Sequence, residues 1–308
     1  MMATMRQFWA GVCLLLVGTS LLAARSAWAD APLILASQKG APLVTWEEVK
    51  AEVGKRVDWR GLARSETGMR KIVEELAWTR LLEQEGEKRG IAKRDENEKM
   101  PFNYPYALAV EKDLTKQCVA PADEAEAKRY YDAHPDAFMT PVRARLQRIV
   151  LPIAAKQGNL PAAVWLQMEA MAIVKGIRTF DQTLADARKL NPGEPMGDLG
   201  YVVLEEDAPI INALKSAKAG EMVGPYVDGD RVYLFLVQEK QEAQRVPWEL
   251  VKANAAKTAL VHCRKQTLKK ERARLFAEYQ VQLDDRAIHQ AYSRRDELAK
   301  LGSGPKLK

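Results

Sequence analysis

The sequence predicts an α+β fold in which helical segments from both ends of the chain flank a central module of strands and helices. Apolar residues recur at helical spacing over residues 69–89 and again over 248–279. Between them, residues 140–240 alternate strand-like branched and aromatic runs with helical ones, separated by glycines. With 308 residues, 47% of them hydrophobic, the chain is long enough to bury more than one core.

The N-terminal flank is expected to begin with a short strand at residues 33–36, followed by a capped helix. Thr45 and Glu48 have the capping-box spacing, in which each side chain bonds the backbone N–H of the other residue. A further helix is expected over 106–117, after the long one at 69–89.

The central module is predicted to have the order β-α-α-β-α-β-β, because its apolar runs change from alternation to helical spacing and back. Its most distinct strands are expected at 145–151, 197–203 and 231–238, and its helices at 160–175, 179–190 and 208–217. The module is therefore a small antiparallel sheet with helices packed on it.

The C-terminal flank is predicted to be one long helix, residues 248–279, that starts after Pro247. One of its faces carries Trp248, Val251, Ala255 and Ala259. Neither flank has enough apolar faces for a core of its own, so we expect the two flanks to pack together. The expected segments are an export signal at 1–29, an N-terminal helical region at 30–139, the module at 140–240, a C-terminal helix at 241–285 and a basic disordered tail at 286–308.

The first residues have the pattern of a secretory signal peptide. Arg6 precedes an almost unbroken apolar run over 8–24, and Ala27 and Ala29 supply the small residues of a cleavage site. Cleavage after Ala29 would place the mature protein in the periplasm; an uncleaved anchor is the less favoured alternative, because the run is short for a membrane span. No later stretch approaches the length of a span, so no stable membrane anchor is expected after cleavage.

The charge of the chain argues against a nucleic-acid partner. Lysine and arginine number 47 against 41 acidic residues, which gives a net charge of +6. Two of the basic residues lie in the predicted signal. Residues 286–308 hold six basic and two acidic residues, and this excess of four accounts for the remaining net charge of the chain. The remaining body is neutral and lacks the basic excess on which nucleic-acid binding depends.

Cysteine and histidine are scarce. The two cysteines of the mature chain, Cys118 and Cys263, are far apart in sequence, and an oxidising compartment permits a disulfide between them. Two separate thiols remain the alternative. The three histidines, His134, His262 and His289, form no cluster at metal-ligand spacing, so neither a metal nor another cofactor is expected.

Three stretches resemble one known family. They are residues 40–49, a glycine turn before a capped helix; residues 130–138, with the pattern Tyr-Tyr-x-x-His-Pro-x-x-Phe; and Gly197-Asp198-Leu199-Gly200 followed by Ala219-Gly220-Glu221. In this order they resemble the exported parvulin-type (PpiC-like) peptidyl-prolyl cis-trans isomerases and the SurA-type and PrsA-type chaperones. The resemblance implies a helical chaperone domain with an inserted parvulin-like module.

The resemblance implies an isomerase that rotates X-Pro bonds, whose barrier is about 18 to 20 kcal/mol. It also implies a histidine pair on the central strands, but this sequence has Arg148 and Tyr233 at those positions. No histidine lies between His134 and His262, so catalysis is expected to be weak or lost. Arg148 and Tyr233 could still polarise a twisted carbonyl, or they could be a purely structural pair. His134 has a less favoured interpretation as a general acid.

The resemblance places the pocket positions at Glu206 and Ile210. An apolar peptide could bind in a groove lined by Leu199, Tyr201, Ile210, Leu214 and Tyr233. The leading hypothesis is therefore a periplasmic folding factor that binds unfolded or proline-containing polypeptides. An active isomerase is the second hypothesis. The alternative from another class is a non-catalytic accessory of an envelope secretion or exopolysaccharide assembly system.

The exported form is predicted to start at Asp30, because cleavage follows the small residue Ala29. N-terminal sequencing of the protein recovered from the periplasm checks this expectation. Recovery of a form that starts at Met1, or beyond Pro42, would contradict it.

Overall fold

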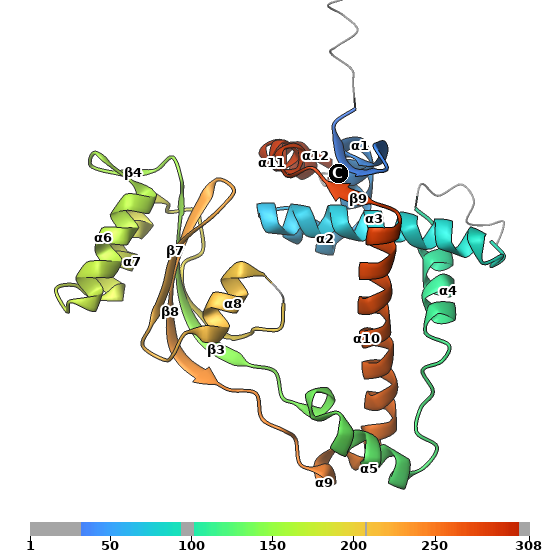
Figure 1. Cartoon of the computed structure of the whole chain (residues 1–308). Coiled ribbons are helices and arrows are strands. Elements are labelled where there is room, and N and C mark those ends of the chain that lie inside the picture. The colour runs from blue at the N-terminus through green and yellow to red at the C-terminus, as the bar shows by residue number, and fades with distance from the viewer. Residues whose placement is uncertain (1–31, 94–101, 207, 302–308) are drawn as a thin grey trace, which may run out of the picture.

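The computed structural model describes residues 32–93, 102–206 and 208–301, which form a helical body and a sheet module (Figure 1). Both ends of the chain contribute to the body, and the module (residues 143–241) is inserted between them. The predicted α+β fold class is confirmed. The predicted export signal, residues 1–29, lies outside the described residues. Within the described ranges, no helix has the length and apolar character needed to span a bilayer.

The helical body combines eight helices of more than one turn with a small sheet. The helices are α1 Trp46–Lys55, α2 Val57–Leu62, α3 Glu66–Lys88, α4 Tyr104–Leu114, α5 Glu124–Ala133, α10 Ala255–Glu278, α11 Asp285–Ser293 and α12 Asp296–Leu301. The strands, in the order β2-β1-β9, are β1 Ile34–Gln38, β2 Ala41–Thr45 and β9 Val281–Leu283. The predicted capping box of Thr45 and Glu48 starts α1.

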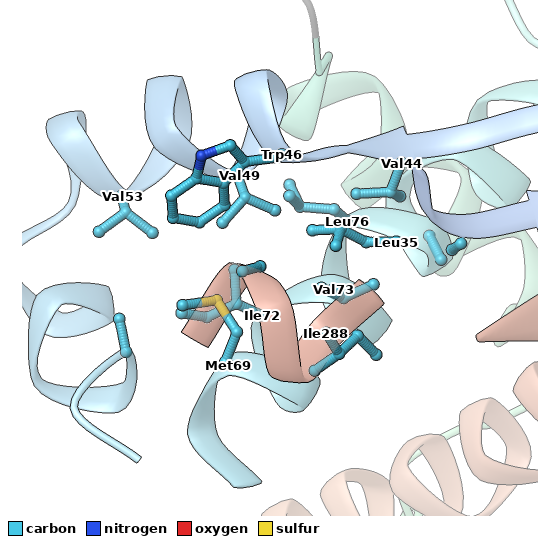
Figure 2. Packing of buried hydrophobic residues seen from close by; sticks show 14 of the residues in the cluster. Leu35, Val44, Trp46, Val49, Val53, Met69, Ile72, Val73, Leu76 and Ile288 are labelled. Carbon is cyan, nitrogen blue, oxygen red and sulfur yellow. The ribbon is translucent and has the colours of Figure 1, made fainter. Parts of the chain in front are cut away.

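The main core of the body joins the two ends of the chain. Trp46 of α1 and Met69 and Leu76 of α3 are almost fully buried and belong to the same cluster as Ile288 of α11 (Figure 2). The expectation of a disordered tail at 286–308 is therefore wrong for the residues that form α11 and α12. The reason is that α11 has an apolar stripe, which the core buries, among the charges that suggested a tail.

The predicted long helix at 248–279 is interrupted. It consists of α9 Trp248–Val251, a 3-10 turn at Lys252–Asn254 and α10, which with 24 residues is about 36 Å long. Asn254 is a poor residue for a helix interior, because its side chain competes for backbone hydrogen bonds. The expected packing of the flanks is confirmed, since Leu275 of α10 lies in one cluster with residues of α3 and α4.

A disulfide links the segment that follows α4 to helix α10. It joins Cys118 to Cys263, whose Cα atoms are 5.7 Å apart, across a separation of 145 residues. Of the two alternatives left open by the sequence, the structure shows the bridge.

The module contains the predicted β-α-α-β-α-β-β order and one additional short hairpin. Its elements are β3 Arg143–Pro152, β4 Lys156–Gln157, β5 Leu160–Pro161, α6 Ala162–Val174, α7 Phe180–Leu190, β6 Gly197–Val203, α8 Pro209–Ser216, β7 Met222–Asp228 and β8 Arg231–Gln241. The sheet has the order β6-β3-β8-β7 with antiparallel pairing throughout. Helices α6 and α7 pack on one face of this sheet, and α8 packs on part of the other.

Contacts in several places connect the module to the body. At one end, the segments that enter and leave the module pair with each other, where Thr140 N–H donates to Gln244 O and Val246 N–H donates to Phe138 O. At the other end, Asp228 and Asp230 at the turn between β7 and β8 contact Thr67 of α3, Tyr292 of α11 and Arg295, which lies between α11 and α12. A further contact is the ion pair between Glu206, which follows β6, and Lys71 of α3. The module is thus attached to the body at its linker end, at the β7–β8 turn and through Glu206.

Reduction of the disulfide is expected to lower the free energy of unfolding by about 3 to 5 kcal/mol, because the bridge closes a loop of well over 100 residues in the unfolded chain. Denaturant titrations of the Cys118→Ser/Cys263→Ser variant and of the oxidised protein measure this difference. Equal stabilities for the two proteins would contradict it.

Candidate functional site

The sheet places Arg148 and Tyr233 on the same face. Arg148 of β3 pairs with Phe235 of β8, and Val150 of β3 pairs with Tyr233. Because residues that are directly opposite or two apart along a strand share a face, Arg148 and Tyr233 are diagonal neighbours. The structure therefore brings together the two residues that stand at the expected histidine positions.

The side chain of Tyr233 is half-buried, and its hydroxyl is available to form a hydrogen bond. Its ring stacks on that of Phe235, with centroids 6.0 Å apart and planes 10° from parallel. Burial raises the pKa of Tyr233 above its usual 10, against the opposing charges of Arg231 and Arg148. Among the described residues, none forms a hydrogen bond with its hydroxyl, so this group is a protonated donor at neutral pH with no partner of its own.

Arg148 is occupied by the loop between α7 and β6. Its Nη2 donates to the carbonyl oxygen of Pro195 at 2.7 Å, while its Nε is buried and has no hydrogen-bond partner in the described part of the chain. Arg231 reaches the same loop through Glu194 at 2.9 Å. Arg148 is thus a positioning residue for the loop, with limited freedom to approach a substrate.

Arg148 and Tyr233 do not belong to the cluster under α8, and we call their part of the face the open half; Tyr233 is half-buried there, and Val150 opposite it is fully buried. The α8 side of the face is filled by a cluster that includes Leu146, Leu214 and Val237. Beyond the strand end, a cavity of 760 Å³ lies between the module and the body. It is lined by Arg60, Ala63, Arg64, Gly193, Glu194, Pro195, Arg231, Arg295, Asp296 and Leu298. The face and the cavity share Arg231 and the loop that Arg148 holds, so together they form the candidate site.

The structure separates the residues expected to line one apolar groove. Leu214 is 2% exposed and forms part of the core beneath α8, and Ile210 packs against the same cluster. Tyr201 pairs with Arg145 and bonds Glu239, which places it on the opposite face from Tyr233. Leu199 is exposed at a register shift in the edge strand β6.

Ile210 and Leu214 are separated from Tyr233 because α8 packs them into the core, and β-bulges explain the positions of the strand residues. One interrupts the β3–β6 pairing between Arg145 and Gln147, and the other interrupts the β3–β8 pairing between Arg145 and Leu146. A single extra residue in a strand reverses the faces of the residues beyond it. Of the five residues expected to line the groove, only Tyr233 lies on the open half of the face.

Glu206, expected to be a pocket residue, instead forms an ion pair with Lys71 of α3. His134 caps the C-terminal end of α5, and its ring packs on Tyr130 at 4.1 Å between centroids. This position supports a packing role for His134, because it lies outside the sheet that carries Arg148 and Tyr233.

Sequence reasoning missed the residues that attach the module near its site. Asp230, in the β7–β8 turn, accepts a hydrogen bond from Tyr292 Oη at 2.5 Å and pairs with Arg295. Gly229 has a φ of +61°, and a Cβ added there would lie 2.1 Å from the ring of Tyr292. The Asp-Gly-Asp sequence indicates a tight turn, but no local signal shows what the turn touches.

The carboxyl of Asp230 has a lowered pKa. Burial opposes ionisation, but the hydrogen bond from Tyr292 and the charge of Arg295 outweigh it and hold the pKa below the usual 3.8. The stabilisation from this carboxylate is therefore complete above the unfolded-state pKa and is lost as pH falls through the lower folded-state pKa. The contact is fully formed at neutral pH.

Comparison with known families identifies the module. Residues 122–253 match the family model of the PPIC-type PPIase domain, a match that includes α5 and the whole sheet module. The module is therefore similar to the PPIC-type PPIase domain, in agreement with the family resemblance of its sequence. The match covers less than half of the chain. No curated protein matches the chain.

Several solved structures are similar to the chain at low identity. One comes from work on PEB4 and Cj1289, SurA-like chaperones of Campylobacter jejuni; it is 16% identical, with 80% of this chain and 98% of that one covered and a TM-score of 0.33. The PrsA peptidylprolyl isomerase of Bacillus cereus is 14% identical, with 82% and 90% covered and a TM-score of 0.30. Bacillus subtilis PrsA is 14% identical, with 87% and 93% covered and a TM-score of 0.23.

Asp230→Asn is expected to loosen the module from the body at neutral pH, because the amide keeps the shape of the carboxylate but removes its charge-assisted bonds to Tyr292 and Arg295. Small-angle scattering should show a larger radius of gyration. Asp186→Asn is a suitable control, since Asp186 pairs with Arg178 and Lys189 within the module. An unchanged radius in the Asp230 variant would contradict the expectation.

Proposed function

We propose that this protein is a periplasmic folding factor of the parvulin type that binds unfolded or proline-containing polypeptides, with weak or lost isomerase activity. The observation that carries the proposal is the position of Arg148 and Tyr233 as diagonal neighbours on one face of the sheet, in a module that matches the PPIC-type PPIase domain. The family position is retained, but the residues that occupy it differ from a histidine pair.

The open half-face supports binding of an extended peptide. Tyr233 and Phe235 present stacked aromatic rings, and the free hydroxyl of Tyr233 can donate to a peptide carbonyl. The cavity of 760 Å³ next to it is within the usual size range of ligand pockets, so it can accept side chains of the bound segment.

The same geometry supports weak catalysis. An isomerase accelerates rotation only through contacts that are stronger with the twisted amide than with the planar one. Arg148 donates to Pro195 O and has a fixed position, which leaves Tyr233 as the single polar group free to follow the rotating carbonyl. One neutral donor stabilises the twisted amide less than a positioned pair of groups would.

Periplasmic location is the part of the proposal that rests on the signal-like sequence of residues 1–29. The disulfide supports it, because stable disulfides persist in oxidising compartments and are rare in the cytosol. Both features support a location outside the cytoplasm.

The purified mature protein is predicted to isomerise a proline tetrapeptide at least about 100-fold more slowly, in kcat/KM, than a parvulin with the histidine pair. Protease-coupled turnover measures the rate. Arg148→Ala should change the small remainder little, because Arg148 is held by Pro195 O, whereas Tyr233→Phe should lower it further. Robust turnover that either substitution abolishes would show instead that these two residues replace the histidines.

Client binding is tested separately with reduced, carboxymethylated α-lactalbumin, which stays unfolded without denaturant. Fluorescence anisotropy of the labelled client should show saturable binding to the full mature chain, and none to the same client when native. Absence of binding to the unfolded form would overturn the proposed function and favour the non-catalytic accessory role.

A further inference from the structure

Helix α6 has apolar side chains on both its buried and its exposed faces. Its inner face, with Trp165, Leu166 and Ala170, belongs to the core between α6, α7 and the sheet. The outer side carries exposed apolar residues: Val164 (47% exposed), Met168 (48%), Met171 (47%) and Val174 (79%). Ile177, three residues after the end of the helix, is also apolar and 72% exposed. A helix that is apolar all round is normally buried on all sides.

The outer face of α6 also lacks charge. The only ionisable residue in the helix is Glu169, which turns inward, where it accepts a hydrogen bond from Thr183 Oγ1 at 2.7 Å and pairs with Arg178 at 3.0 Å. Gln167 is the only polar residue on the exposed side. Lys175, the exposed residue directly after the helix, is the charge nearest to this face in sequence, so the outer face of the helix itself is uncharged.

The fold does not require this apolar exposure. Helix α7 packs on the same face of the sheet, yet its own exposed positions include Asp181, Arg188 and Lys189. Helices α6 and α7 thus cover the same face of the sheet, but the solvent-exposed side of α7 is charged and that of α6 is apolar. A role outside the stability of the module accounts for the difference better than packing does.

We propose that the outer face of α6 is a docking surface for apolar segments of unfolded polypeptides, separate from the candidate site. The inference rests on the proposed function and names a further surface for the same class of ligand. Figure 1 shows α6 on the side of the sheet that faces away from α3 and α10, so the surface is accessible while the module is attached to the body.

Area and chemistry favour an unfolded segment over a second copy of this chain. Five partly exposed side chains present roughly a few hundred Å², the size of patch that marks interaction sites. A stable dimer buries about 800 Å² on each partner, which is more than this face offers. Methionine side chains are unbranched and polarizable, so Met168 and Met171 can adapt to apolar segments of different sequence.

The test compares binding of reduced, carboxymethylated α-lactalbumin by the full mature chain and by the Met168→Glu/Met171→Glu variant. Both positions are exposed, so the variant should fold, which circular dichroism and thermal unfolding verify. We expect its affinity for the client to fall at least about tenfold, since two charges replace apolar contact area. The matched control, Leu250→Glu/Val261→Glu, changes two exposed apolar residues of α9 and α10 and should bind as the unmodified chain does.

A photo-crosslinker placed at Met171 gives a second measurement, which stays informative if the double variant unfolds. It should label the unfolded client, whereas the same probe at Leu250 should not.

If the unmodified chain binds the client and the α6 variant binds equally well, the inference is overturned while the proposed function stands. A concentration-dependent dimer in sedimentation that Met168→Glu abolishes, with client binding unchanged, would likewise overturn it and assign the face to a second copy. If the unmodified chain binds no client, both proposals fail.

Discussion

The antiparallel pairing of β1 with β9 is the constraint on which the rest of the structure depends. It aligns Ala36 with Leu283, residues from opposite ends of the chain, and so fixes where α10 ends and where α11 begins. Helix α11 then completes the core with Ile288 and presents Tyr292 to the turn of the module. The position of the module against the body is therefore a consequence of a contact between the chain ends.

Arg148 connects the fold of the module with its chemistry. The guanidinium of Arg148 brings a permanent charge into a half-buried position, and that charge needs a partner. The carbonyl of Pro195 supplies one, which orders the loop that borders the cavity. The residue that stabilises the wall of the site is thereby less free to act on a substrate, and Tyr233 is left as the adaptable group.

Local features could be predicted from the sequence, and long-range ones could not. The capping box at Thr45 and the order of strands and helices in the module depend on neighbouring residues, so periodicity and capping rules were sufficient. The faces of Tyr201 and Leu214 depend on bulges and on the seating of α8, which no periodicity encodes. The partners of Asp230 come from about 60 residues further along the chain, so only the folded structure could reveal them.

The two proposed binding surfaces lie on opposite sides of the module sheet. The face of Tyr233 looks onto a cavity shared with the body, so what binds there is limited by the attachment of Asp230 to Tyr292 and Arg295. Helix α6 lies behind the opposite face, and its exposed methionines are unaffected by that attachment. Under the proposed function, a segment bound on α6 would therefore not depend on the contacts of Asp230, whereas a segment at the cavity would.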